Sequence, residues 1–136
     1  MIRISVFFVA GSILGLCTSG ALSAPKDTYD KCVGSTSTNS EWAECGRREI
    51  SRQESRLNAA WKKAQSCFDI KEEVEKNAKE ALLDEQRLWV KWKNGACTLF
   101  YYGGREGQVL NYPMCKIKVI KDRVDWLTDF TNDCHR

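Results

Sequence analysis

The sequence has little of what most enzyme active sites are built from. Its 136 residues include a single histidine, His135, which is the second-last residue, and no Cys-x-x-Cys pair. The position of the only imidazole argues against Ser-His and Cys-His catalysis, and the missing cysteine pair argues against a zinc site. No segment shows sustained alternation of polar and apolar residues, which argues against strands. We therefore expect no enzymatic activity, no metal and no cofactor.

Long apolar runs are also missing. The longest, residues 4–17, has about 14 residues, whereas a membrane-spanning helix needs about 20. One arginine precedes this run and small residues close it at Ala24, which is the pattern of a secretory signal. We expect residues 1–24 to be a signal peptide and residues 25–136 to form one exported domain, periplasmic or secreted, with no transmembrane segment. A lipid anchor on Cys17 is the alternative, because the residues before it loosely resemble a lipobox.

An excess of one charge is absent as well. With the arginine of the signal removed, the 21 basic residues become 20, against 18 acidic residues, and the net charge becomes +2. A chain so close to balance lacks the strong positive field that favours binding to nucleic acids or anionic membranes. We expect no nucleic-acid partner.

Apolar residues recur every three or four positions in three segments, which predicts an all-α fold. The first helix is expected from about residue 41 to 68, after N-cap residues at 38–40. The second is expected to end near Tyr102, before Gly103-Gly104, and the third to follow Pro113. Two long helices exceed the usual globular length, so we expect an antiparallel three-helix bundle. The segment before it, up to Ser40, predicts an irregular N-terminal arm.

Six cysteines remain after the signal, which predicts three disulfides in an exported chain. Helices one and three both end at one end of the bundle, so Cys67 is expected to pair with Cys134. Helix lengths of about 33 and 28 Å place the other four cysteines at the opposite end. Our preferred pairing joins Cys45 to Cys115 and Cys32 to Cys97, and the other divisions of these four stay open.

One glutamate and three tryptophans lie on the apolar stripes of the predicted helices, and we expect them to stabilise the fold. Glu85 lies on the apolar stripe of the second helix, and we expect it to form a salt bridge with Arg123 or Arg56 rather than to act as a catalytic carboxylate. Trp61, Trp89 and Trp92 also occupy stripe positions, and we expect them in the core. Both expectations assign these residues to stability.

The order of several residues resembles the LprI family of small exported bacterial proteins, named for a lysozyme inhibitor. These residues are Cys32, Thr38, Glu41, Cys45, Leu57-Asn58, Gln86, Trp89, Cys97, Gly103-Gly104, Cys115, Arg123 and Leu127. Cys67 and Cys134 look like an additional pair. The resemblance implies a helical, disulfide-linked periplasmic domain that blocks a lysozyme or another cell-wall hydrolase by protein–protein contact. A periplasmic structural or adaptor protein without a hydrolase target is the alternative.

The segment from Phe100 to Tyr112 is the candidate binding site. It is expected to be a glycine-rich loop anchored by the flanking cysteines. Tyrosine and arginine are enriched at binding hot spots, so Tyr101, Tyr102 and Arg105 are the predicted contact residues. An ordinary connection between helices is the alternative for this segment.

Overall fold

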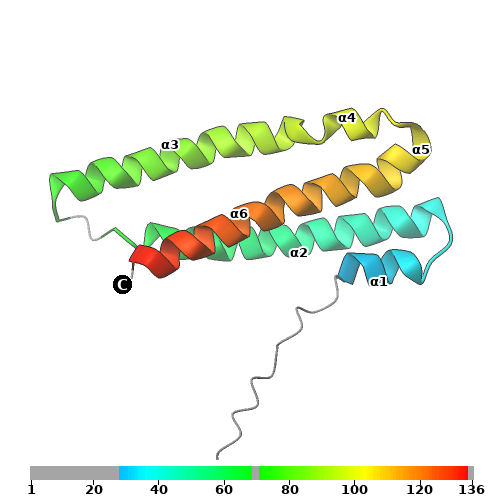
Figure 1. Cartoon of the computed structure of the whole chain (residues 1–136), viewed down its shortest axis with the longest axis horizontal. Helices are drawn as coiled ribbons and strands as arrows, with labels where there is room; N and C mark the ends of the chain where they lie inside the picture. Colours follow the sequence, from blue (N-terminus) through cyan, green and yellow to red (C-terminus); the bar gives the residue numbers. More distant parts are fainter. Residues whose placement is uncertain (1–27, 69–70, 135–136) are drawn as a thin grey trace, which may run out of the picture.

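The computed structural model describes residues 28–68 and 71–134, and within these ranges every regular element is a helix. The three long helices are α2 (Asn39–Gln65), α3 (Glu73–Ala96) and α6 (Tyr112–Cys134). Each runs antiparallel to the next along the chain, and together they form an elongated bundle (Figure 1). The predicted all-α fold is confirmed.

Two features discussed from the sequence fall outside the described residues. The expected signal peptide, residues 1–24, and the histidine at position 135 lie outside the described residues. Within the described part, no helix is both long and apolar enough to cross a membrane.

A capping box fixes the start of α2. The Thr38 hydroxyl accepts a hydrogen bond from the backbone N–H of Glu41 at 3.3 Å, and the Glu41 carboxylate accepts one from the backbone N–H of Thr38 at 3.0 Å. Two backbone donors that a helix start leaves unpaired are thereby satisfied. The Glu41 carboxylate also accepts a hydrogen bond from the Thr38 hydroxyl at 2.7 Å, and this bond, followed by those from the backbone N–H groups of Ser37 and Thr38, lowers the pKa of Glu41. The predicted N-cap is confirmed.

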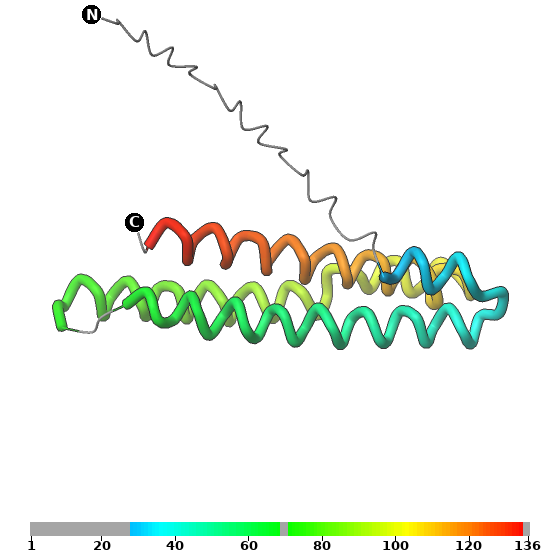
Figure 2. The backbone as a smooth tube through the Cα atoms, turned by 90° about the horizontal axis from the view of Figure 1, so that it is seen from below, coloured from blue at the N-terminus to red at the C-terminus, as the bar shows by residue number. Residues whose placement is uncertain are grey.

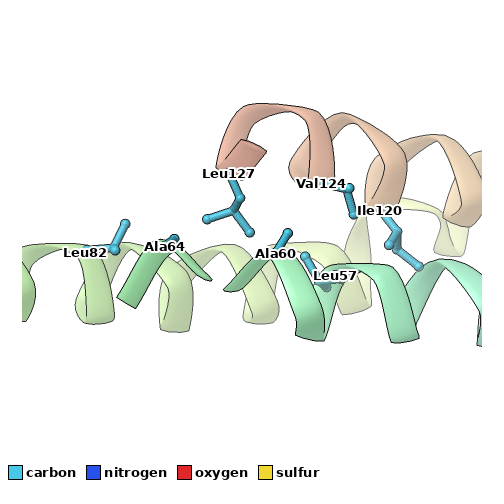
Figure 3. Close-up of a cluster of buried hydrophobic side chains, with 7 residues drawn as sticks. All are labelled: Leu57, Ala60, Ala64, Leu82, Ile120, Val124 and Leu127. Carbon is cyan, nitrogen blue, oxygen red and sulfur yellow. The ribbon is translucent and has the colours of Figure 1, made fainter. Parts of the chain in front are cut away.

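The main core lies between α2 and α6. Figure 3 shows small and branched side chains of the two helices facing each other, with one leucine from α3 at the edge. The buried members are Leu57, Ala60 and Ala64 of α2, Ile120, Val124 and Leu127 of α6, and Leu82 of α3. Alanines on α2 let α6 approach closely, because they leave room for the larger side chains opposite. Leu82 is the only fully buried residue within Glu73–Ala96.

The tryptophan prediction holds for two of the three residues. Trp61 and Trp89 are partly buried and pack against the core, whereas Trp92 is 57% exposed. The apolar residues of α3 form two adjacent lines along the helix. The line that contains Leu82 and Trp89 packs against the core. Trp92 lies on the other line, at the edge of α3, where it lines a shallow groove with Arg123 and Trp126 of α6.

The expected irregular arm is wrong, because part of it is a helix. Helix α1 (Thr28–Gly34) folds back beside the start of α2 (Figures 1 and 2). Tyr29 is buried there against Cys45 and Ile117, and its hydroxyl donates to the carbonyl of Leu110 at 3.2 Å. Seven residues are too few to show a clear period, so long-range contacts stabilise this helix rather than its own pattern.

The expected loop at residues 100–112 is also helical. It contains α4 (Thr98–Tyr101), α5 (Gly104–Glu106) and the π-helical segment η1 (Gly107–Asn111), which leads directly into α6. The widened turn lies just before Pro113, a residue that has no backbone N–H to donate. Helix three therefore begins earlier than the proline suggested.

The three disulfides join Cys67 to Cys134, Cys32 to Cys45 and Cys97 to Cys115. The first is the predicted pair, at the end of the bundle where α2 and α6 both end. The other four cysteines gather at the opposite end, as expected, but the predicted pairs Cys45–Cys115 and Cys32–Cys97 are wrong. Helix α1 brings Cys32 beside Cys45, and the compact α4–η1 segment keeps Cys97 beside Cys115.

Candidate interaction surface

The end of the bundle that carries α4 and α5 is held as a compact turn. The Cys97–Cys115 disulfide ties its two ends together, and Cys97 is fully buried. Gly104 has a φ of +72°, which favours glycine because other residues clash there. A β-carbon at Gly107 would collide with the carbonyl oxygen of Phe100, so only glycine lets η1 lie this close to α4. The segment is thus a constrained cap and not a protruding loop.

This cap exposes three consecutive aromatic side chains and a cation. Phe100 is 45% exposed, Tyr101 47% and Tyr102 80%, and Arg105 is exposed beside them. We call these four residues the aromatic tip. The ring of Tyr101 packs edge-on against Tyr102 and Tyr112, with centroids 6.2 and 5.6 Å apart. Neighbouring rings therefore restrict Tyr101, while Tyr102 projects into solvent. Exposed aromatic clusters of this kind mark binding surfaces.

The three predicted contact residues are all exposed, and they lie on short helical turns of the cap. Tyr101 belongs to α4, Tyr102 ends it, and Arg105 belongs to α5. Phe100 is a member of the tip that the sequence reasoning did not single out. The spacing of Val109, Pro113 and Ile117 continues the stripe of α6 backward and was the available sign that this segment is helical.

A second polar cluster joins α6 to α3. Arg123, only 5% exposed, donates from Nη1 to a Glu85 oxygen at 2.8 Å and from Nη2 to the other oxygen. It also donates from Nε to the Gln86 side-chain oxygen at 2.9 Å. The guanidinium lies 4.4 Å from the ring centroid of Trp126 and 5.4 Å from that of Trp89. The predicted Glu85–Arg123 salt bridge is confirmed, and its donors are directed at the two α3 side chains.

A third cluster surrounds a buried carboxylate where α1 meets α2. Glu49 is 4% exposed and accepts hydrogen bonds from Thr28 at 2.5 Å, Arg52 at 2.8 Å and Gln53 at 2.7 Å. Burial alone would raise the pKa of Glu49, but the hydrogen bonds from Arg52, Thr28 and Gln53 outweigh it and lower the pKa to about 2. At neutral pH this carboxylate is ionised and saturated with donors, so its role is to hold α1 on α2.

All six cysteines in the described ranges are in disulfides. Within residues 28–68 and 71–134, no three histidine, cysteine or acidic side chains converge on a point that could hold a metal ion. Disulfides persist in oxidising compartments outside the cytoplasm, which agrees with an exported protein. The aromatic tip is the candidate binding surface.

Fold and tip together define a small disulfide-bonded helical protein with an exposed aromatic end. The chain belongs to the lysozyme inhibitor LprI family, whose family model matches residues 31–127. This match covers most of the chain and includes the whole aromatic tip. No curated protein and no solved structure matches the chain. The family is one of inhibitors, which agrees with a function in binding rather than in catalysis.

Proposed function

We propose that this protein is exported and blocks a lysozyme or another cell-wall hydrolase by direct contact through the aromatic tip. The observation that carries the proposal is the set of three consecutive exposed aromatic residues on a turn closed by the Cys97–Cys115 disulfide. A partner gains apolar contact there without ordering a flexible loop, and preorganisation of this kind favours affinity. Membership in the inhibitor family gives the class of partner.

Arg105 supplies the charge for this contact. Lysozyme-type enzymes work with a pair of carboxylates in a cleft, and a guanidinium can form paired hydrogen bonds with a carboxylate. Arg105 is exposed on α5, three residues after Tyr102 in the sequence. In the proposed complex Arg105 contacts the catalytic carboxylates, and Tyr101 and Tyr102 contact the rim of the cleft.

A lysis assay with wild type and Arg105→Ala at equal concentrations tests the proposal. Truncating one partner of a buried charge pair costs about 2–5 kcal/mol, so the variant should lose affinity by about 30- to 5000-fold. The fold should be unaffected because Arg105 is exposed. Arg47→Ala is the matched control, since Arg47 is 67% exposed on α2 and does not belong to the aromatic tip.

Three results are informative. Loss of inhibition in Arg105→Ala, with wild-type inhibition in Arg47→Ala, supports the tip. Equal inhibition by wild type and Arg105→Ala moves the contact to another surface. Absence of inhibition by the wild type contradicts the proposal and leaves a structural or adaptor role in the cell envelope.

A further inference from the structure

An apolar stripe runs along the outer side of α3 and on into α4. Val74 is 67% exposed, Leu88 65%, Trp92 57% and Leu99 79%. α3 forms the upper edge of the bundle in Figure 1, and no described element lies beyond it. The stripe consists of Val74, Ala78, Ala81, Glu85, Leu88, Trp92, Gly95 and Leu99, and we call it the outer seam.

The spacing of the outer seam is that of a coiled coil. Within α3 its positions alternate between steps of four and three residues from Val74 to Gly95, which is the heptad repeat of helices that pack side by side along their length. Leu99 follows on α4, beyond the end of α3 at Ala96. The inner line of Leu82 and Trp89 already packs against the core. The outer seam is thus a second, largely exposed face on the same helix. α6 reaches only its inner edge, where Arg123 binds Glu85 and where Trp92 lines a shallow groove with Trp126.

Glu85 is the one charged residue in the outer seam. Both of its carboxylate oxygens accept hydrogen bonds from Arg123, which draws the charge toward α6. Its aliphatic carbons remain on the seam between Ala81 and Leu88. The salt bridge therefore makes this position compatible with an apolar neighbour.

Charge divides α3 into two halves of opposite sign. From Glu73 to Glu85 there are five acidic and two lysine residues, a net charge of −3. From Gln86 to Ala96 there are three basic residues and no acidic one, a net charge of +3. A helix of this kind attracts an antiparallel copy of itself, because each acidic half then lies beside a basic half. A parallel copy would place like charges together.

We propose that the outer seam binds the outer seam of a second copy of this chain, antiparallel, about a two-fold axis between Gln86 and Arg87. In this register Ala81 lies opposite Trp92 of the partner subunit, so that a small residue faces a large one, as close packing requires. Glu85 lies opposite Leu88 of the partner subunit. The same register places Asp84 beside Lys91 of the partner subunit on the flank of the seam, twice by symmetry.

The dimer has a consequence for the aromatic tips. At a rise of 1.5 Å per residue, each tip lies about 20 Å from the two-fold axis along α3. The two tips therefore lie at opposite ends of the dimer, about 40 Å apart, and face away from each other. Each remains accessible to its own partner. The self-association itself does not depend on what the tip binds.

Sedimentation equilibrium of the oxidised protein, without any hydrolase, tests the proposal. The wild type should show a reversible monomer–dimer equilibrium between about 1 and 500 μM. Leu88→Glu should raise the dimer dissociation constant at least about tenfold, because it places two carboxylates near the axis. Met114→Glu is the matched control, because Met114 is 55% exposed on α6, outside the seam. The dimer dissociation constant of this variant should stay within about twofold of the wild-type value.

A charge swap tests the orientation. Asp84→Lys and Lys91→Asp should each weaken the dimer, because each puts like charges together across the flank. The double variant should recover wild-type association. A wild type that stays monomeric over the whole range overturns the proposal, and so does unchanged association of Leu88→Glu. Failure of the double variant to recover overturns the antiparallel register. None of these results bears on inhibition through the tip.

Discussion

The Arg123 cluster should carry a large share of the attachment of α3 to the bundle. Leu82 is the only fully buried residue of α3, so apolar packing holds this helix weakly. Arg123 reaches from α6 to Glu85 and Gln86 and stacks between two tryptophans. The informative change is Arg123→Met, which keeps the apolar stem and the approximate length while removing the guanidinium.

The expected cost follows from three contributions. Breaking a fully buried charge pair costs about 3–5 kcal/mol, but the Glu85 side chain is 48% exposed and water can solvate the carboxylate left behind. We therefore assign about 1–2 kcal/mol to the salt bridge. Two cation–π contacts add about 0.5 kcal/mol each. Arg123→Met should lower the free energy of unfolding by about 2–3 kcal/mol and the Tm by about 10 °C.

Thermal and guanidinium unfolding of the oxidised protein, followed by circular dichroism, measure this loss. Glu85→Gln and the double variant complete a cycle, in which Arg123 and Glu85 should couple by about 1–2 kcal/mol. Lys118→Met is the control, because Lys118 pairs with Asp122 on the surface and should cost less than about 0.5 kcal/mol. If Arg123→Met costs no more than Lys118→Met, other contacts hold α3 and the reasoning is wrong.

Two further predictions concern stability. The pKa of Glu49 is about 2 in the folded protein against an ordinary value of 4.5, so its stabilisation is full above about pH 4.5 and is lost as the pH falls toward 2. Acid unfolding should show this loss, and Glu49→Gln should flatten it. Removing Cys67–Cys134, which closes a 67-residue separation, should cost about 4 kcal/mol in the chain-entropy account, against about 3 kcal/mol for Cys32–Cys45 with its separation of 13. Guanidinium unfolding of the two double-alanine variants checks the order, and a larger loss for Cys32–Cys45 would contradict the entropic account.

Local sequence was a good guide where the elements are long. α2 and α6 carry many turns of one apolar period, and Thr38 with Glu41 is a local cap, so neither needs information from distant residues. The Cys67–Cys134 pair followed from helix lengths alone, because both helices end at one end of an antiparallel bundle. The contact residues Tyr101, Tyr102 and Arg105 were chosen by residue type, and their role stays a prediction.

Short elements could not be predicted in the same way. α1 has seven residues, and it is held by the Cys32–Cys45 bridge and by the hydrogen bond from Thr28 to Glu49. The predicted pairing of Cys32 with Cys97 is wrong because α1 folds back on α2 and brings Cys32 beside Cys45. Contacts between residues far apart in the sequence decide this, and a local pattern does not contain them.

By itself, the sequence determined that the chain forms long amphipathic helices, and it placed four cysteines at one end of the bundle and two at the other. Tertiary structure decided the partners of Cys32, Cys45, Cys97 and Cys115, and it decided how α3 is rotated. The apolar arc of α3 is wide enough for either of two lines to face α6. Arg123 binds Glu85 and Gln86, and Lys93 binds Glu54 of α2. These contacts rotate α3 so that Leu82 is buried and Leu88 is 65% exposed. A helix period fixes which residues share a face, but only the packing partners fix where that face points.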